Sequence, residues 1–189
     1  LIAEVRAKPG TVSIGHSGNG TTNHVSILRL QLNEQVKFNI VPYRGSGPGI
    51  NDLLADNLDT FADQLTSSMP HIKSGKLRPL VSFGLDKIPE LPDVPTLTEQ
   101  GVKNADATNW FGVVVPAATP RAIVDALNAR VNEALASPDV RQRLEGLGLV
   151  IGGGTPASFA AFVLTALWVL GTAPSTHVGE NGLPEQGAP

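Results

Sequence analysis

The sequence predicts an α/β fold with a largely parallel sheet. Short apolar segments alternate with longer segments whose apolar residues recur at helical spacing, which is typical of βαβ units. Glycine-rich loops follow the first two apolar segments and precede helical ones, and ligands bind at this edge of parallel sheets. Pairs of a hydroxyl residue and proline then mark three helix starts nearer the C-terminus.

Composition excludes several classes of protein. Of the 189 residues, 41% are hydrophobic and 16% are charged, as in globular domains. The net charge of -3, with lysine and arginine scattered, provides no basic face, so no nucleic-acid partner is expected. The absence of cysteine excludes disulfides, thiolate chemistry and cysteine-ligated zinc.

Residues 1–7 have the spacing of the last turns of an amphipathic helix, which Lys8, Pro9 and Gly10 end. A domain rarely begins in such turns. We therefore expect further chain upstream, and an export signal, which these residues do not show, to belong to it.

Five strands are expected, and helices separate the first four. The strands are residues 11–16, 36–41, 57–62, 77–83 and 110–115, and the helices are residues 21–33, 50–55 and 67–74. Pro79 favours an edge or bulged position for the fourth strand, whereas the fifth is apolar throughout, which favours burial on both faces.

Spacing and capping residues complete the expected helices. The inward residues are Val25, Leu28 and Leu32 in the first helix, and Leu53 and Leu54 in the second. In the third helix, Ser67 or Ser68 is expected at the N-cap, and Gly75 is expected to end it.

Three more helices are expected in the C-terminal half. Their N-cap and first residues are Thr119–Pro120, Ser137–Pro138 and Thr155–Pro156. The apolar stripes are Ile123, Leu127, Val131 and Leu135 in the first, and Val140, Leu144 and Leu147 in the second. Residues 157–171 are apolar but shorter than the roughly 20 residues of a membrane span, and the glycine and proline content of residues 172–189 predicts disorder.

The segment GHSGNGTTNH, residues 15–24, raises the question of a hydrolase nucleophile. A nucleophile elbow would make Ser17 the nucleophile, but that turn needs glycine where Asn19 stands, and it needs an upstream oxyanion loop. Asp63 and His71 follow in an acceptable order for a triad, yet they lie close together on one local segment. A serine-type acyl hydrolase is therefore kept only as an alternative.

Nucleotide and metal sites fit the sequence less well. A P-loop needs a lysine at the helix start, and none occurs between Lys8 and Lys37, while a dinucleotide fingerprint would need glycine at Asn23. His16 and His24 are expected on opposite sides of the loop without a paired carboxylate. We interpret them as loop or cap histidines satisfied by hydrogen bonds, and we expect no metal or cofactor.

An anion-binding loop is the second interpretation of this segment. Gly18 and Gly20 allow the backbone to approach a ligand, and Thr21 begins a helix whose free N–H groups point into the loop. A carboxylate there would meet these donors and the positive end of the helix. A structural turn without a ligand explains the residues equally well. The loops at residues 43–49 and 63–67 are expected at the same edge of the sheet.

Six segments recur together in one known family. They are KPGTVSIGHSGNGTTNH at 8–24, VPYRGSGPGINDLLADNLD at 41–59, SSMPHIKSGKLRPL at 67–80, LPDVPTLTEQGV at 91–102, WFGVVVPAATP at 110–120 and GGTPASFAAFV at 153–163. In this order they resemble the solute-binding receptors of tripartite tricarboxylate transporters, also called the Bug family. The similarity covers about residues 1–163.

The resemblance implies a periplasmic receptor of the Venus-flytrap type, with two α/β lobes and a hinged cleft, and no enzymatic activity. Such receptors bind small di- or tricarboxylates or acidic amino acids and deliver them to membrane permease subunits, without a cofactor. The residues that the resemblance places at the ligand are Ser17, Asn19, Gly20, Thr21, Tyr43, Gly45, Ser46, Asp63 and Thr66.

The resemblance also implies that only part of the receptor is present. Residues 1–109 match the second lobe, residues 110–163 match the return segment of the first lobe, and residues 164–189 depart from the family and are expected to be disordered. We expect the return segment to expose its apolar faces and the chain to bind weakly or not at all. A frameshift or gene-fragment end is the preferred origin of residues 164–189. A membrane-associating segment is the alternative there, and a fragment without function is the alternative for the chain.

Overall fold

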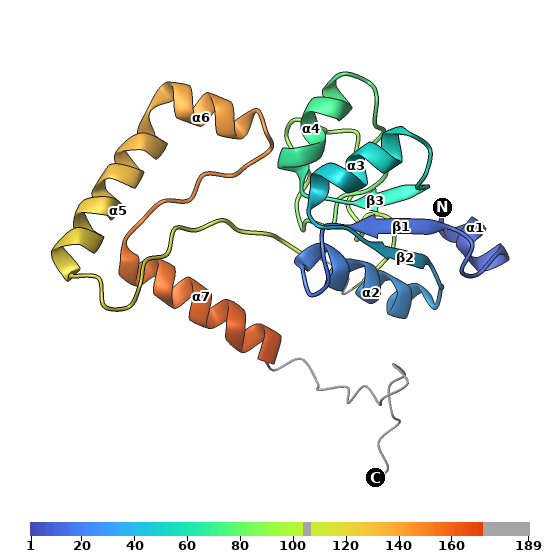
Figure 1. Cartoon of the computed structure of the whole chain (residues 1–189), viewed down its shortest axis with the longest axis horizontal. Helices are drawn as coiled ribbons and strands as arrows, with labels where there is room; N and C mark the ends of the chain where they lie inside the picture. Colours follow the sequence, from blue (N-terminus) through green and yellow to red (C-terminus); the bar gives the residue numbers. More distant parts are fainter. Residues whose placement is uncertain (104–106, 172–189) are drawn as a thin grey trace, which may run out of the picture. The chain divides into compact units, whose positions relative to one another are not determined.

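The computed structural model describes residues 1–103 and 107–171. The chain divides into two units (Figure 1): Leu1–Val113 with Arg141–Ile151, and Val114–Val140 with the segment from Gly152 onward. Each unit is described by itself below.

A parallel three-stranded sheet forms the centre of the first unit. Its strands are β1 (Ser13–His16), β2 (Asn39–Pro42) and β3 (Thr60–Ala62), in the order β2-β1-β3. Gly15 pairs with Val41 of β2 and with Phe61 of β3. The sheet confirms the predicted α/β class and three of the expected strands, each of which begins later than the sequence pattern indicated.

Helices follow all three strands. They are α2 (Thr22–Glu34) after β1, α3 (Ser46–Leu54) after β2 and α4 (Leu65–Lys73) after β3. The chain moves from β1 to β2 on one side, and then crosses back past β1 to β3. Right-handed crossovers therefore place α2 and α3 on opposite faces of the sheet, as Figure 1 shows.

The face that α2 covers holds the hydrophobic core. Ile14 and Ala62 of the sheet pack with Ile27 and Leu30 of α2, and all four are buried. The remaining members are Val5 of α1 (Ile2–Ala7), Val12, Phe38, Leu97 and Val102. Burial of these side chains fixes α2, and with it the start of the helix, at the carboxyl edge of the sheet.

The Phe61 ring fills the opposite face. A methyl group at Gly15 or at Gly49 would overlap this ring, so β1 and the first turn of α3 both approach it more closely than a side chain would permit. Tyr43 packs edge-on against the ring, with centroids 5.9 Å apart. Glycine is therefore required at both positions, and α3 lies close against the sheet.

Asp59 ties the amino end of β1 to the segment before β3. Its Oδ2 atom accepts hydrogen bonds from the Ser13 N–H at 2.8 Å and from the Ser13 hydroxyl at 2.6 Å. The Asp59 N–H donates in return to Ser13 Oγ at 2.9 Å. The bonds from Ser13 stabilise the ionised carboxylate and so lower the pKa of Asp59.

Two expected strands are wrong. Within residues 77–83 only Ser82 forms a bridge, to Thr96, and Pro79 lacks the N–H that a continuous ladder would need. Residues 110–115 form no strand in the described part of the chain, and Val114 is 79% exposed. Their apolar side chains lie on the surface because no described strand pairs with them. This exposure agrees with the one expected for a return segment.

The inward face of α2 also differs from the expected one. Its buried residues are Asn23, Ser26, Ile27 and Leu30, whereas Val25, Leu28 and Leu32 are exposed. The polar Asn23 can be buried because its amide donates to Ser17 Oγ at 3.1 Å.

The other two helices of this unit begin earlier than expected. α3 begins at Ser46, buries Gly49 and Ile50, and leaves Leu54 exposed although it was expected inward. The N-cap of α4 is Gln64, without a side-chain cap, so capping by Ser67 or Ser68 is wrong. Gly75 has a φ of +72° just after the C-cap of α4, as expected for a residue that ends a helix.

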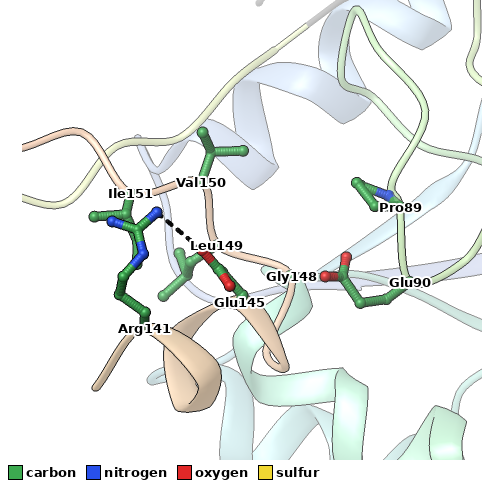
Figure 2. Close-up of a pocket in the computed structure, with 8 residues that line it drawn as sticks. All are labelled: Pro89, Glu90, Arg141, Glu145, Gly148, Leu149, Val150 and Ile151. Atoms are coloured by element: carbon green, nitrogen blue, oxygen red, sulfur yellow. Dashed lines mark hydrogen bonds and ion pairs between the residues drawn. The ribbon is translucent and has the colours of Figure 1, made fainter. Parts of the chain in front are cut away.

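The end of α6 (Pro138–Glu145) contributes a small pocket to the first unit (Figure 2). Its lining residues are Pro89, Glu90, Arg141, Glu145, Gly148, Leu149, Val150 and Ile151, around a volume of about 380 Å³. Arg141 is paired with Glu145 at 3.2 Å, and Lys73 of α4 holds the chain after α6 by donating to the Gly146 carbonyl at 2.7 Å.

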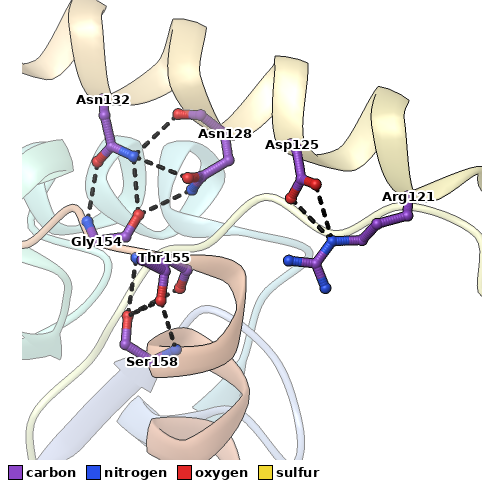
Figure 3. Close-up of polar contacts among 7 residues, drawn as sticks. All are labelled: Arg121, Asp125, Asn128, Asn132, Gly154, Thr155 and Ser158. Carbon is purple, nitrogen blue, oxygen red and sulfur yellow. Dashed lines mark hydrogen bonds and ion pairs between the residues drawn. The ribbon is translucent and has the colours of Figure 1, made fainter.

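In the second unit, two asparagines of α5 (Arg121–Ala136) hold the chain before α7 (Pro156–Gly171), as Figure 3 shows. Asn132 accepts from the Gly154 N–H at 2.9 Å and donates to the Gly154 carbonyl at 2.8 Å, and Asn128 donates to the same carbonyl at 2.9 Å. The expected apolar stripe of α5 is exposed at Ile123, Leu127 and Val131.

The expected helix caps are confirmed at two of three positions. Ser137 Oγ accepts from Val140 N–H at 3.4 Å, and Thr155 Oγ1 accepts from Ser158 N–H at 3.0 Å. At α5, however, Pro120 is itself the N-cap, and no side chain caps the helix. Thr119 is therefore one residue too early.

No helix in the described part of the chain is long and apolar enough to cross a membrane. Residues 164–171 form the last turns of α7, so this part of the expected disordered tail is helical. The disorder expected for residues 172–189 lies outside the described residues.

Candidate functional site

Three loops meet at the carboxyl edge of the sheet. They follow β1, β2 and β3 and lead into α2, α3 and α4. The first two are joined, because Tyr43 N–H donates to His16 O at 2.9 Å and Gly45 N–H donates to Ser17 O at 3.0 Å. β1 sends the chain to one side and pairs with β3 on the other, so this edge is a topological switch point, where open parallel sheets bind ligands.

Side chains fix nearly every residue of the loop after β1. Thr21 caps α2: its Oγ1 accepts from His24 N–H at 3.4 Å, and its hydroxyl donates to the Gly18 carbonyl at 2.7 Å. Asn23 holds the Ser17 hydroxyl, as described above. Asn19 is exposed at the apex of the loop, without a hydrogen-bond partner among the described residues. The loop is therefore ordered before any ligand binds, and this lowers the entropic penalty of binding.

His16 and His24 stack beside this loop, and the expectation that they lie on opposite sides is wrong. Their centroids are 4.4 Å apart, and the planes differ by 13°. His16 is fully buried, and burial lowers its pKa; its hydrogen bond to Gly18 opposes this shift, while the charge of His24 adds to it. The two backbone contacts of the rings, to Gly18 and Gly20, agree with the interpretation of loop histidines, although His16 Nε2 is unsatisfied.

Asp63 connects the helix starts after β2 and β3. Ser46, the first residue of α3, donates to its Oδ1 at 2.5 Å, and Ser68 of α4 donates to its Oδ2 at 2.6 Å. Both carboxylate oxygens are thus occupied, so Asp63 organises the site rather than facing a ligand carboxylate. Ser68 was predicted only as a possible helix cap and not as a site residue; its position one turn after the β3 loop is the signal that could have identified it.

The Tyr43 side chain is engaged within its own unit. Its hydroxyl donates to Asp52 Oδ2 at 2.8 Å, and burial, with the neighbouring carboxylate, raises the pKa of the phenol. Gly45, the N-cap of α3, has a φ of +97° and offers no capping side chain. Thr66 lies half-buried in the first turn of α4. The nine predicted residues therefore lie on three adjoining loops or helix starts.

This arrangement favours anion binding over catalysis. Three helix N-termini converge at one edge, and α3 and α4 have no side-chain caps, so first-turn N–H groups remain available. Ser17 Oγ accepts a hydrogen bond from the Asn23 amide and donates to no base among the described residues, and Asp63 is held by two serines instead of His71. The triad of the hydrolase alternative is therefore not formed.

Other sites are less suited to an anion. The pocket in Figure 2 presents the carboxylates of Glu90 and Glu145, and Arg141 is already paired, so it would repel a negatively charged ligand. No group of three metal-ligating side chains occurs among the residues that the structure describes.

Solved structures define the class of protein. The chain matches Rpa4515 of R. palustris with adipate at a TM-score of 0.83 and 32% identity, covering 90% of this chain and 57% of that one. It matches MatC from Rhodopseudomonas palustris with bound malate at a TM-score of 0.75 and 31% identity, covering 88% of this chain and 56% of that one. It matches the periplasmic binding protein BugD at a TM-score of 0.81 and 29% identity, covering 89% of this chain and 57% of that one. The fold is thus that of a periplasmic binding protein.

The chain belongs to the tripartite tricarboxylate transporter family receptors, whose family model (TctC) matches residues 1–161. It is 38% identical over 161 residues to the UPF0065 protein in the tcbD-tcbE intergenic region of Pseudomonas sp. strain P51, covering 85% of this chain and 48% of that protein. It is 33% identical over 163 residues to BugT of Bordetella pertussis, covering 86% and 50%. The chain thus spans about half the length of these relatives, and the family consists of receptors rather than enzymes.

Proposed function

We propose that this chain carries one ligand-binding lobe of an extracytoplasmic solute receptor that binds a small organic acid. The observation that carries the proposal is the convergence of the three loops and three helix starts at the switch point of the sheet. Two matching structures hold adipate and malate, both dicarboxylic acids, and this supports a di- or tricarboxylate as the ligand class.

In this proposal, a ligand carboxylate meets the N-terminus of α2 and the loop formed by Ser17, Asn19, Gly20 and Thr21. Tyr43, Gly45, Ser46, Asp63 and Thr66 complete this wall of the site. The helix dipole contributes about 1 kcal/mol, and each charge-assisted hydrogen bond contributes about 1.5–3 kcal/mol before desolvation. Two or three such bonds supply a large part of the roughly 8 kcal/mol of a micromolar complex.

The remaining assignments follow the family. We assign residues 1–109 to the second lobe, residues 110–163 to the return segment of the first lobe, and residues 164–189 to a tail outside the family pattern. The complete receptor would act in the periplasm and deliver its ligand to the permease subunits of a tripartite transporter. Because the other wall of the cleft lies in the half that this chain does not span, the chain alone should bind at millimolar concentration or more weakly.

Isothermal titration tests the proposal. Malate, adipate, citrate and glutamate are titrated into the chain, and into a chimera in which the Pseudomonas relative supplies the other half. We expect micromolar binding of at least one acid by the folded chimera, and no hydrolysis of nitrophenyl esters by either protein. A folded chimera that binds none of these acids, or micromolar binding by the chain alone, would contradict the proposal.

A serine substitution locates the ligand. Ser17→Ala in the chimera should weaken binding about tenfold without abolishing it, since the backbone donors remain. Ser74→Ala, at the C-cap of α4 and distant from the loops, is the matched control and should bind normally.

A further inference from the structure

His16 and His24 form a pair whose arrangement needs an explanation. His16 is fully buried, and its Nε2 atom has no hydrogen-bond partner among the described residues. An unsatisfied buried polar atom is unfavourable, so some other contact must hold the ring in place. Stacking on His24 is one such contact, but it leaves open why two imidazoles are placed together.

The two rings contact the backbone of the loop after β1, residues 17–20, and this explains their placement. His16 Nδ1 lies 2.9 Å from Gly18 O and 3.2 Å from Gly18 N, and the Gly20 N–H donates to His24 Nδ1 at 3.2 Å. Each ring thus contacts one of the two loop glycines, and both glycines have positive φ. We propose that His16 and His24 are positioning residues that hold Gly18 and Gly20 in the ligand-binding shape of the loop, and that they do so only while the pair is uncharged.

The uncharged state follows from the hydrogen bonds. An imidazole Nδ1 accepts an N–H only when it carries no proton, so protonation of His24 removes the bond to Gly20. Protonation of His16 would place an N–H at the buried Nε2 atom, which has no acceptor among the described residues. The charged ring would also lie against the stacked His24 ring. The lowered pKa of His16, caused first by burial, agrees with this geometry.

Other ionisable groups near the loop do not account for a pH dependence of its contacts to His16 and His24. Those on the adjoining elements are Arg29 and Glu34 on α2, Tyr43 and Arg44 after β2, Asp52 on α3, Asp63 after β3, and His71 and Lys73 on α4. The hydroxyl of Tyr43 and both carboxylate oxygens of Asp63 are engaged in the hydrogen bonds described above, and Arg44 is exposed. Among charged groups, only His24 shifts the pKa of His16.

Amide NMR on the 189-residue chain tests the loop directly, without a ligand. The Gly20 amide signal should move between pH 8 and pH 5, because a proton on an imidazole Nδ1 removes its acceptor. In His24→Asn, which keeps a side-chain oxygen near the position of Nδ1 but does not titrate, that movement should disappear. His71→Asn, which changes a histidine on α4 outside the loop, should titrate at Gly20 as the original chain does. A Gly20 signal that is constant in the original chain, or that still titrates in His24→Asn, would overturn the proposal.

Isothermal titration of the chimera described above, with an acid that it binds, tests the consequence and rests on the proposed function. At pH 7.5, His24→Ala in the chimera should bind about threefold to tenfold more weakly, the effect of one neutral hydrogen bond, and His24→Asn should restore most of this loss. At pH 5 the original chimera should bind more weakly than its His24→Asn variant, a comparison in which the protonation of the acid itself cancels.

Two results would overturn this second part: normal binding by the His24→Ala chimera at pH 7.5, or tighter binding by the original chimera than by its His24→Asn variant at pH 5, which would show that charge attraction dominates. If the folded chimera binds none of the four acids at either pH, the proposed function fails, whereas the Gly20 signal of the 189-residue chain still decides the positioning role.

Discussion

Gly20 joins the loop after β1 to α2 with a φ of +76°, a conformation that costs other residues about 1–2 kcal/mol. No neighbouring atom lies within 4 Å of the place where its Cβ would stand, so the strain of a substitution is conformational rather than steric. We expect Gly20→Ala to lower the free energy of unfolding by about 1–2 kcal/mol in urea denaturation.

Gly47→Ala is the matched control for this prediction. Gly47 lies in the first turn of α3, also faces open space, and has no positive φ. Alanine is favoured over glycine within helices by about 1 kcal/mol, but a Cβ directly before Pro48 disfavours helical backbone. The two effects oppose each other, so this variant should lose less stability than Gly20→Ala. Equal losses at the two glycines would show that backbone conformation does not decide the outcome.

At the opposite end of β1, Asp59 gives stability a pH dependence with a definite sign. Its pKa is lowered in the folded state, so its contribution is complete above the unfolded value near 3.9 and is lost as the pH falls through the lower folded value. Asp59→Asn should therefore be about 1 kcal/mol less stable at pH 7, with a difference that shrinks below about pH 4.

Thermal denaturation across this pH range measures the difference. Asp93→Asn, at an exposed aspartate without a hydrogen-bond partner among the described residues, is the matched control and should not lower the stability at pH 7. A difference for Asp59→Asn that stays constant from pH 7 to pH 3 would exclude the linkage.

Among the elements, α3 depends most directly on one close contact. A methyl group at Gly49 would overlap the Phe61 ring, so Gly49→Ala should destabilise the chain by about 1–3 kcal/mol, more than Gly47→Ala two residues away. Chemical denaturation measures both. Adding Phe61→Leu to Gly49→Ala should recover part of the loss, and the absence of any recovery would locate the strain elsewhere.

Local signals predicted the elements that depend on local interactions. The helix start near Thr21, the glycine stop after α4 and the short buried strand of β1 are set by neighbouring residues, and the sequence shows them. The strands expected at 77–83 and 110–115 failed because a strand needs a partner, and hydrophobicity alone does not indicate whether one is present.

The difference between local and non-local interactions also explains which parts of the candidate site were predicted. Glycine-rich loops after parallel strands are recognisable, so the loops around Ser17 and Ser46 were found from the sequence. The burial of Asn23 and the stacking of His16 on His24 depend on side chains that meet only after α2 has folded back along β1. Polar residues on a buried helix face also displaced the expected apolar stripe, which no periodicity rule would anticipate.

At the scale of the whole molecule, residues 110–115 expose apolar side chains. Phe111, Val113 and Val114 are each more than 60% exposed, and exposed apolar segments of this kind promote contacts between copies. We expect the chain to self-associate with rising concentration in sedimentation velocity, and Val114→Lys to shift it toward monomer. Val150→Lys, at a valine that is 92% exposed outside this segment, should not shift it.

The double hold on Asp63 has a mechanical consequence. Because one carboxylate ties the first residue of α3 to the first helical turns of α4, neither helix start can be displaced without dragging the other. The loops after β2 and β3 should therefore move as one rigid unit. New ligand preferences in such a receptor would then evolve by exchanging side chains while the backbone of both loops stays the same. Reshaping one loop alone would break the hydrogen bonds of Asp63 that support the other loop.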